Sequence, residues 1–365
     1  MKKNSNYEKI YALESLRGIA ALLIALFHYP SSSFLFFEKG FYAVNFFFIL
    51  SGFVISYNYA DRIKNLSDLI QFQIKRFYRL YPVHLFVLGL ILLIQTAKYL
   101  IIEYTDYSYG SEAFGSRYTI KDFFANLLLV HSIFNFSYWL SWNPASWSIS
   151  TEFYTYIIFA LIFLLFKNYK FILILIFVIL FSSIFIDKYN YFSLTDYNSL
   201  FNGVFFQCLF NFGNGCVVYF VFSRIKFFFN DLLSISVLIF IFVIYYFYNK
   251  FFYQYNFLVF SLIILIFSKL NRSSYVYRII NIKPLVFLGT ISYSFYMIHE
   301  SIIYLLIQSL KFIFKIEFIL DGKTAVHTLS SFTDTWITLL YILLSILTAY
   351  GMHRFIELRF RKNKS

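Results

Sequence analysis

Hydrophobic residues dominate the chain in runs of about 17–25 residues, the length an α-helix needs to cross a bilayer. Polar residues collect between the runs, and all four prolines fall at run boundaries, where proline suits the first turn of a helix. The pattern therefore predicts an all-α polytopic membrane protein that forms a single domain over residues 1–365. We expect ten spans, at about 12–30, 41–60, 81–102, 149–167, 170–187, 200–222, 232–248, 253–269, 285–310 and 334–355.

One further apolar stretch, 122–140, contains Asn126, His131 and Asn135 and is expected to form a re-entrant or interfacial helix. The basic residues favour this interpretation. If the N-terminus lies inside, about two thirds of the 31 Lys and Arg residues fall on the cytoplasmic side, as the positive-inside rule expects. An eleventh span would invert every later loop. Both termini are therefore expected in the cytoplasm, with a short basic tail after a core over about 12–358.

Composition narrows the class further. The chain is 60% hydrophobic and 24% aromatic, and its 13% of charged residues is about half the soluble norm of roughly 25%. The net charge of +13 is explained by cytoplasmic loops, so membrane lipids are expected as partners and nucleic acid is not. The basic N-terminus resembles a signal peptide, but no small-residue cleavage pattern follows, which favours a retained helix. Cys208 and Cys216 share one predicted span and are expected to be packing residues.

The first span contains two residues that hydrocarbon disfavours, Arg17 and His28. A charged side chain near the bilayer centre costs at least about 2.5–3.5 kcal/mol on insertion scales. Eleven residues at about 100° each place both side chains on one face, about 16 Å apart along the axis. Two explanations are open: the side chains snorkel to opposite headgroup layers, or both serve a site inside the bundle. The predicted orientation puts Arg17 toward the cytoplasm and His28 toward the outside.

A cytoplasmic amphipathic segment, 61–80, ends in Arg76 and Arg79. Their i, i+3 spacing places both guanidinium groups on one helix face. Such a pair suits phosphate, and Lys75 adds charge beside it. The alternative is a positive-inside anchor in contact with anionic lipid.

Glu152 lies about one turn into an apolar span, in the sequence WSISTE, at the same approximate depth as His28. A carboxylate beside an imidazole can fix its tautomer and raise its basicity, as general-base chemistry needs. The alternative is a partner for the helix dipole. Ser148, one turn earlier, is a candidate for lining the same cavity.

A third polar cluster lies in GTISYSFYMIHE, residues 289–300. Positions 292, 296 and 299 follow one helix face that would line a polar cavity. His299 is interpreted as a structural donor between helices, with a second functional imidazole as the alternative. The six histidines show no i, i+4 pairing with one another or with cysteine, so no metal site is expected. The cavity-lining candidates in this cluster are Tyr293, Tyr296 and His299.

The order and spacing of these features resemble the membrane acyltransferase 3 family, which includes bacterial O-antigen, peptidoglycan and exopolysaccharide O-acetyltransferases. The resemblance covers about residues 12–358. Its motifs are Arg17–ten residues–His28, FFFILSGFVIS at 46–56, KRFYRLYP at 75–82, WSISTE at 147–152 and ISYSFYMIH at 291–299.

The resemblance implies ten helices around a central cavity in a bacterial inner membrane. It also implies an acyl-CoA co-substrate, usually acetyl-CoA, no tightly bound cofactor, and a carbohydrate hydroxyl acceptor outside the cytoplasm. His28 would be the principal catalytic residue and Arg17 an essential companion, while Arg76 and Arg79 would engage the donor and Glu152 would occupy the acidic position. Some relatives carry a further esterase-like domain, and the end of this chain at residue 365 favours direct acylation of a lipid-linked or membrane-proximal glycan.

The resulting hypothesis has coenzyme A bound from the cytoplasm by Arg76, Arg79 and Arg17. His28, oriented by Glu152, then removes the proton of a sugar hydroxyl, or forms an acyl-histidine intermediate. The rival class is a glycan or anion transporter, because intramembrane charges mark substrate pathways too. Transporters often show internal repeats, and neither the first-span segment nor WSISTE has a second copy. The sequence allows a homo-oligomer without requiring one.

Overall fold

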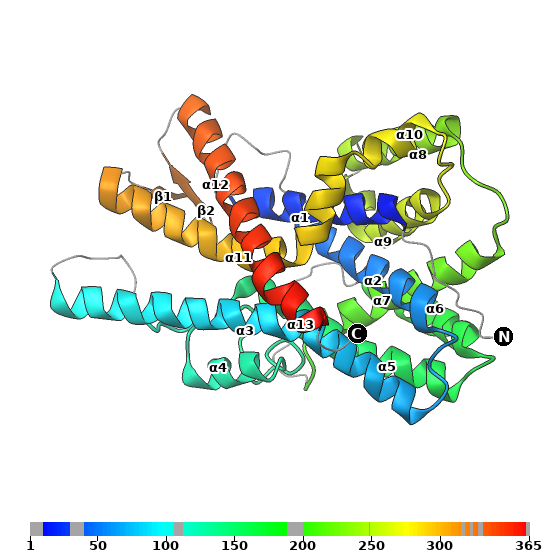
Figure 1. The fold of residues 1–365 in the computed structure, drawn as a ribbon, viewed down its shortest axis with the longest axis horizontal. Helices are drawn as coiled ribbons and strands as arrows, with labels where there is room; N and C mark the ends of the chain where they lie inside the picture. Colours follow the sequence, from blue (N-terminus) through cyan, green and yellow to red (C-terminus); the bar gives the residue numbers. More distant parts are fainter. Residues whose placement is uncertain are drawn as a thin grey trace.

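The computed structural model describes residues 10–29, 40–105, 112–187, 200–247, 249–314, 318–321, 324–327 and 331–362. This part of the chain is helical apart from one short antiparallel hairpin, β1 (Phe318–Asp321) with β2 (Thr324–His327), as Figure 1 shows. The α-helices are α1 (Tyr11–His28), α2 (Ala43–Tyr59), α3 (Leu66–Tyr104), α4 (Ile120–Leu127), α5 (Trp147–Leu165), α6 (Lys170–Asp187), α7 (Gly203–Arg224), α8 (Asp231–Phe247), α9 (Asn249–Ser268), α10 (Tyr275–Ile280), α11 (Lys283–Phe314), α12 (Ser331–Met352) and α13 (Leu358–Lys362). Shorter turns are the 3₁₀-helices η2 (Gly40–Tyr42) and η3 (Pro144–Ser146) and the π-helix η4 (His353–Glu357).

The predicted helical membrane architecture is confirmed. Within the described residues, six helical segments are long and apolar enough to cross a bilayer, and α6, α8 and α9 contain shorter apolar stretches. A helix corresponds to each of the ten expected spans, although the number of crossings stays a prediction. The six segments are Tyr11–His28, Gly40–Tyr59, Leu66–Tyr104, Pro144–Leu165, Gly203–Arg224 and Thr333–Arg361.

Three details of the expected map are wrong. The segment 61–80 and the span after it form one helix, α3, with Pro82 inside rather than at its start. Proline fixes φ near the helical value and removes only one backbone donor, so a helix stabilised on both sides continues through it. The stretch 122–140 is helical only over α4, because turns follow from Leu128 onward. Neither the hairpin nor α10 was expected.

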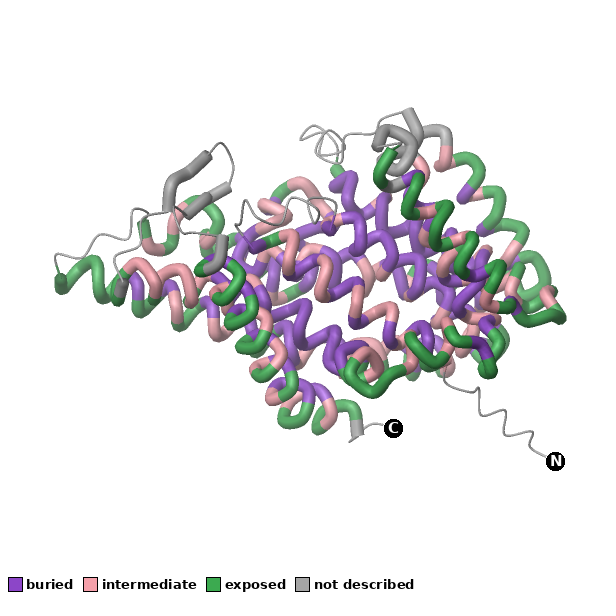
Figure 2. Tube along the Cα trace, turned by 90° about the horizontal axis from the view of Figure 1, so that it is seen from above, coloured by how far each residue is buried: buried purple, intermediate pink, exposed green. Residues whose placement is uncertain are grey.

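The core of the bundle is a pair of parallel helices, α1 and α11. Glu14 lies beside Gly289 at one end, and His28 lies beside His299 at the other. The close approach needs glycine: a Cβ at Gly289 would overlap the Glu14 carbonyl oxygen, and a Cβ at Gly18 would crowd the Gly289 amide. Figure 2 shows buried residues concentrated in the middle of the molecule, with exposed residues along the helices at its periphery.

A second parallel pair, α2 and α7, packs beside the first. Gly52 faces the Phe212 carbonyl and Gly215 faces the Ile49 carbonyl, each too close for a Cβ. Asn45 at the start of α2 accepts a hydrogen bond from Gln207 near the start of α7. In the expected map, α1 and α11 are the first and ninth spans, and α2 and α7 are the second and sixth. Successive spans cross the bilayer in opposite directions, so the two helices of each pair are expected to run in the same direction, as they do.

Candidate active site

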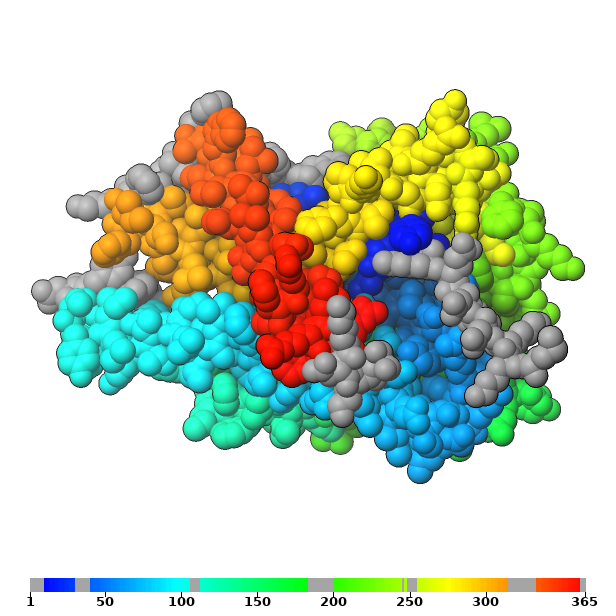
Figure 3. Space-filling view, in the orientation of Figure 1, coloured from blue at the N-terminus to red at the C-terminus, as the bar shows by residue number. Residues whose placement is uncertain are grey.

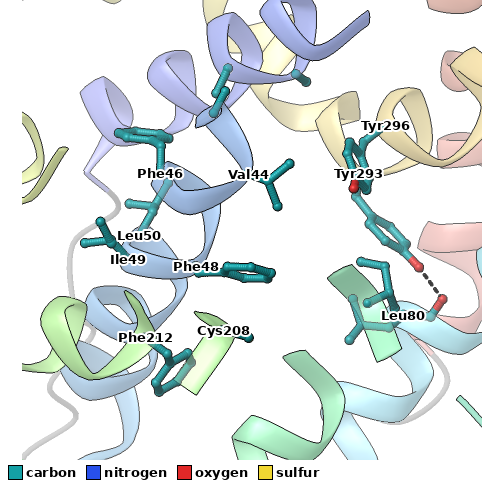
Figure 4. Packing of buried hydrophobic residues seen from close by; sticks show 14 of the residues in the cluster. Val44, Phe46, Phe48, Ile49, Leu50, Leu80, Cys208, Phe212, Tyr293 and Tyr296 are labelled. Atoms are coloured by element: carbon teal, nitrogen blue, oxygen red, sulfur yellow. Dashed lines mark hydrogen bonds between the residues drawn. The ribbon is translucent and has the colours of Figure 1, made fainter. Parts of the chain in front are cut away.

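Five helices, α1, α2, α3, α5 and α11, enclose a cavity of about 110 Å³. Its walls are partly apolar: Figure 4 shows Val44 and Phe48 of α2 on one side and Tyr293 and Tyr296 of α11 on the other. Tyr293 donates a hydrogen bond to the Leu80 carbonyl oxygen, which ties α11 to α3. The predicted site residues that line this cavity are Arg17, Arg76, Arg79, Ser148, Glu152, Tyr293 and Tyr296.

The two arginines of α3 reach the cavity because their i, i+3 spacing places them on the same side of the helix. Asn65 caps this helix by accepting a hydrogen bond from the Asp68 amide. Arg76 donates to the Tyr59 hydroxyl at 3.2 Å, while its Nε is buried without a hydrogen-bond partner in the described structure. Lys75 is exposed and does not line the cavity, because adjacent helical residues point about 100° apart.

Carboxylates surround these cations. Arg17 lies 3.6 Å from the Glu14 carboxylate, and Glu152 and Glu357 lie within electrostatic range of both Arg17 and Arg79. These carboxylates therefore partly neutralise the positive charge of the arginines when no ligand is bound. Such a site favours an anion that can replace the carboxylates as a partner.

The predicted pairing of Glu152 with His28 is wrong. Glu152 accepts a hydrogen bond of 2.6 Å from Tyr156. It lines the cavity together with Arg17, Arg76 and Arg79, which we call the arginine end of the site. Ser148, Glu152 and Tyr156 are spaced by four residues, so one face of α5 carries all three toward α2 and α3. The similar depth predicted for Glu152 and His28 did not bring the two side chains together, because His28 faces α11 and Glu152 faces the cavity.

His28 sits at the C-terminal end of α1, outside the cavity lining, with 34% of its side chain exposed. Its Nδ1 lies 2.9 Å from the Ile24 carbonyl oxygen and 3.3 Å from Nε2 of His299. Its Nε2 lies 3.6 Å from the Glu300 carboxylate. Besides the Ile24 carbonyl in its own helix, the partners of His28 are therefore two consecutive residues of α11.

The hydrogen bonds fix the tautomers of both rings. His299 Nδ1 lies 2.6 Å from the Tyr296 carbonyl oxygen, which can only accept, so Nδ1 carries the proton and Nε2 a lone pair. By the same reasoning His28 holds its proton on Nδ1, facing the Ile24 carbonyl and the His299 ring. In the neutral ring, Nε2 of His28 then carries the lone pair, which is the form a general base requires.

Tyr296 connects the cavity to the histidine pair. Its hydroxyl accepts a hydrogen bond of 2.9 Å from Ser148 on the cavity wall. Its ring lies 5.8 Å from the His299 ring and 6.1 Å from the Phe47 ring, measured between centroids. The arginine end thus meets the His28/His299 pair, which we call the histidine end, across the buried side chain of Tyr296.

Sequence reasoning missed the contribution of the C-terminal segment. Glu357 is buried at the end of η4 and accepts hydrogen bonds from His353 and Ser294, at 2.9 and 3.1 Å. Arg361 of α13 lies within electrostatic range of Arg79, and Figure 3 shows this end of the chain lying against α3. The i, i+4 pair His353/Glu357 was a signal in the sequence that was not used.

The loop before α4 also contributes charge. Arg117 lies within electrostatic range of Glu300. Tyr118 beside it is partly buried, and burial raises the pKa of its hydroxyl group above the ordinary value. Tyr118 therefore stays neutral, and Arg117 is the charge that this loop directs toward the histidine end.

Comparison with known families agrees with this arrangement. A family sequence model described as an acyltransferase domain matches residues 10–354, nearly the whole chain. The chain belongs to the acyltransferase 3 family. No curated protein and no solved structure matches it. As an acyltransferase 3 protein, this membrane-helical chain is an acyltransferase, and the predicted family resemblance is confirmed.

Membership in the acyltransferase 3 family also gives the two ends of the site a chemical meaning. Acyl transfer needs a group that holds the donor and a group that activates the nucleophile. Among the described residues, the cavity offers guanidinium groups and the histidine pair offers imidazole nitrogens.

Proposed function

We propose that the protein transfers an acyl group, with acetyl as the expected case, from cytoplasmic acyl-CoA to a hydroxyl group of a cell-envelope carbohydrate. The observation that carries the proposal is the arrangement along α1, where Arg17 lines an arginine cavity and His28 presents a basic nitrogen about 16 Å further along. A donor with anionic and reactive ends separated by a flexible arm fits such a pair of sites.

The arginine end would bind the phosphates of coenzyme A. Guanidinium groups match phosphate oxygens with paired, charge-assisted hydrogen bonds, and the unpartnered Nε of Arg76 is available for such a bond. Arg17, Arg76 and Arg79 would jointly bind the donor. Lys75 would not take part, because it is exposed and does not line the cavity.

At the histidine end, His28 would act as the general base. Nε2 takes the proton of a sugar hydroxyl while the hydroxyl oxygen bonds to the thioester carbonyl carbon. The carbon–sulfur bond then breaks, and the coenzyme A thiolate takes the proton from the imidazolium. The Glu300 carboxylate, 3.6 Å from Nε2, would stabilise the positive ring. Attack by Nε2 itself, through an acyl-histidine, is the alternative route.

The acceptor side follows from the proposed orientation. We place both termini in the cytoplasm and His28 toward the outside of a bacterial inner membrane. The excess of basic residues in the loops assigned to the cytoplasm supports this orientation, and the parallel packing of α1 with α11 and of α2 with α7 agrees with alternating crossings. The partial exposure of His28 would admit a lipid-linked or membrane-proximal glycan. A transporter that lacks acyl chemistry is disfavoured by the family of the chain.

The test uses the purified protein in lipid discs with acetyl-CoA, following free thiol with and without candidate glycans. Wild type is compared with His28→Ala and with Lys75→Ala as the matched control. Glycan-dependent thiol release that His28→Ala abolishes and Lys75→Ala retains is the expected result. A wild type that neither binds nor consumes any of several acyl-CoA donors would refute the proposal.

A further inference from the structure

We propose that His28, His299 and Glu300 form a binding site for a zinc ion at the outer end of α1 and α11. One ligand atom from each residue lies within 4.8 Å of the others. The site is argued from the geometry of these side chains alone, and only its effect on catalysis rests on the proposed function.

The distances are close to those of a zinc site. Zinc binds imidazole nitrogen and carboxylate oxygen at about 2.0–2.2 Å, so two ligands in tetrahedral geometry lie roughly 3.4 Å apart. His28 Nε2 and the Glu300 oxygen are already 3.6 Å apart. One nitrogen or oxygen atom of each residue already lies within 4.8 Å of the others, about 1.4 Å more than the tetrahedral separation, and rotation of the half-exposed His28 side chain can supply the difference.

The imidazoles are held as metal-binding histidines usually are. Such residues donate their second ring nitrogen to a carbonyl or carboxylate, which fixes the tautomer and aims the lone pair. Here the Ile24 carbonyl faces His28 Nδ1 and the Tyr296 carbonyl faces His299 Nδ1. Both Nε2 atoms therefore carry a lone pair that can bind a metal without a change of tautomer, once His299 Nε2 leaves its contact with His28 Nδ1.

The surroundings favour a zinc ion that keeps an open position. His299 is fully buried, Glu300 is mostly buried, and His28 is partly exposed, so an ion has a rigid base and a route of entry. Three protein ligands with a fourth position left to water are typical of accessible zinc sites. Arg117, within electrostatic range of Glu300, would oppose the ion and reduce its affinity.

Zinc and the base use the same atom. If Nε2 of His28 holds zinc, it cannot accept the proton of a hydroxyl group. Zinc binding would also separate His28 Nδ1 from His299 Nε2, which lie 3.3 Å apart without it. We therefore expect zinc to inhibit acyl transfer and a chelator to restore it.

Zinc binding is measured by titration calorimetry on chelator-washed protein in lipid discs, without donor or acceptor. Wild type is expected to bind one zinc ion per chain, and His299→Ala and Glu300→Gln to bind it at least about tenfold more weakly. The control is His353→Gln, which removes the histidine of the other buried His–Glu pair and should leave zinc affinity unchanged. Magnesium should not bind, because imidazole ligands select zinc.

The outcomes separate the two proposals. A wild type that binds no zinc, or ligand variants that bind it as wild type does, would overturn the site. Glu300→Gln keeps the shape of the side chain, so thermal unfolding in discs identifies a variant that fails merely by misfolding. Zinc that binds at this site without slowing thiol release would leave the site intact and refute His28 Nε2 as the base.

Discussion

The two ends of the site are built differently. At the arginine end, long side chains meet carboxylates loosely, as in the 3.6 Å contact between Arg17 and Glu14. At the histidine end, short rings are held by backbone carbonyls, with contacts of 2.9 Å for His28 and 2.6 Å for His299. Backbone atoms move less than long side chains, so the first end suits charge binding and the second suits positioning.

This difference predicts different kinetic consequences. Removing an interaction that only the transition state uses lowers kcat, whereas removing one that holds the donor throughout raises KM. Substitutions at the histidine end should therefore lower kcat, and substitutions at the arginine end should act mainly on the affinity for the donor. The following variants test that separation.

The largest effect is expected from His28→Gln. Loss of a positioned general base typically costs about 10²–10⁴-fold in rate, while the arginine cavity stays intact. We expect kcat to fall within that range and the Kd for acetyl-CoA, measured by calorimetry, to change less than about twofold. Weaker donor binding of the same size as the rate loss would contradict the separation.

Arg79→Ala and Arg76→Ala should weaken donor binding. A hydrogen bond to a charged group contributes about 1.5–3 kcal/mol, which corresponds to roughly 10–150-fold in affinity. Each variant should raise the Kd for acetyl-CoA by about that factor and leave kcat at saturating donor nearly unchanged. Lys75→Ala, next to Arg76 but exposed, is the control, and an equal effect there would point to general surface charge.

Gly289→Ala should disturb the histidine end from a distance. The added methyl group overlaps the Glu14 carbonyl oxygen, and overpacking of this kind costs about 1–3 kcal/mol. We expect a lower thermal midpoint and a reduced kcat, because α11 carries His299 and Glu300. Gly89→Ala is the matched control, since a Cβ there meets nothing within 4 Å, and it should lower neither quantity.

The smallest effect is expected from Glu152→Gln. The change removes a negative charge beside the arginines and keeps a side-chain oxygen for the Tyr156 hydroxyl. Acetyl-CoA should bind a few-fold more tightly, with little change in kcat, because no competing carboxylate remains there. A large loss of kcat at unchanged Kd would restore the pairing of Glu152 with His28 and reverse the assignment made above.

The positions of the long apolar helices followed from the sequence because hydropathy sets where a chain can cross a bilayer. Arg76 and Arg79 line the cavity together, as their i, i+3 spacing predicted, and Arg17 joins them, as the donor-binding hypothesis expected. The partner of Glu152 did not, because a linear pattern gives depth and face on one helix but not which helix it faces. Glu300 was passed over as a site residue for the same reason: only the parallel packing of α11 on α1 brings it to His28.

That packing has a consequence for how the two helices can vary. Gly18 precedes His28 by ten residues, and Gly289 precedes His299 by ten as well. Because the two glycines are in contact, the equal spacing of ten residues brings the His28 and His299 rings to the same height along the two helices. A one-residue deletion after either glycine would turn the following ring by about 100° and withdraw it by about 1.5 Å. Replacements on the outer faces of α1 and α11 are therefore tolerable, whereas insertions and deletions between glycine and histidine are not, unless both helices change length together.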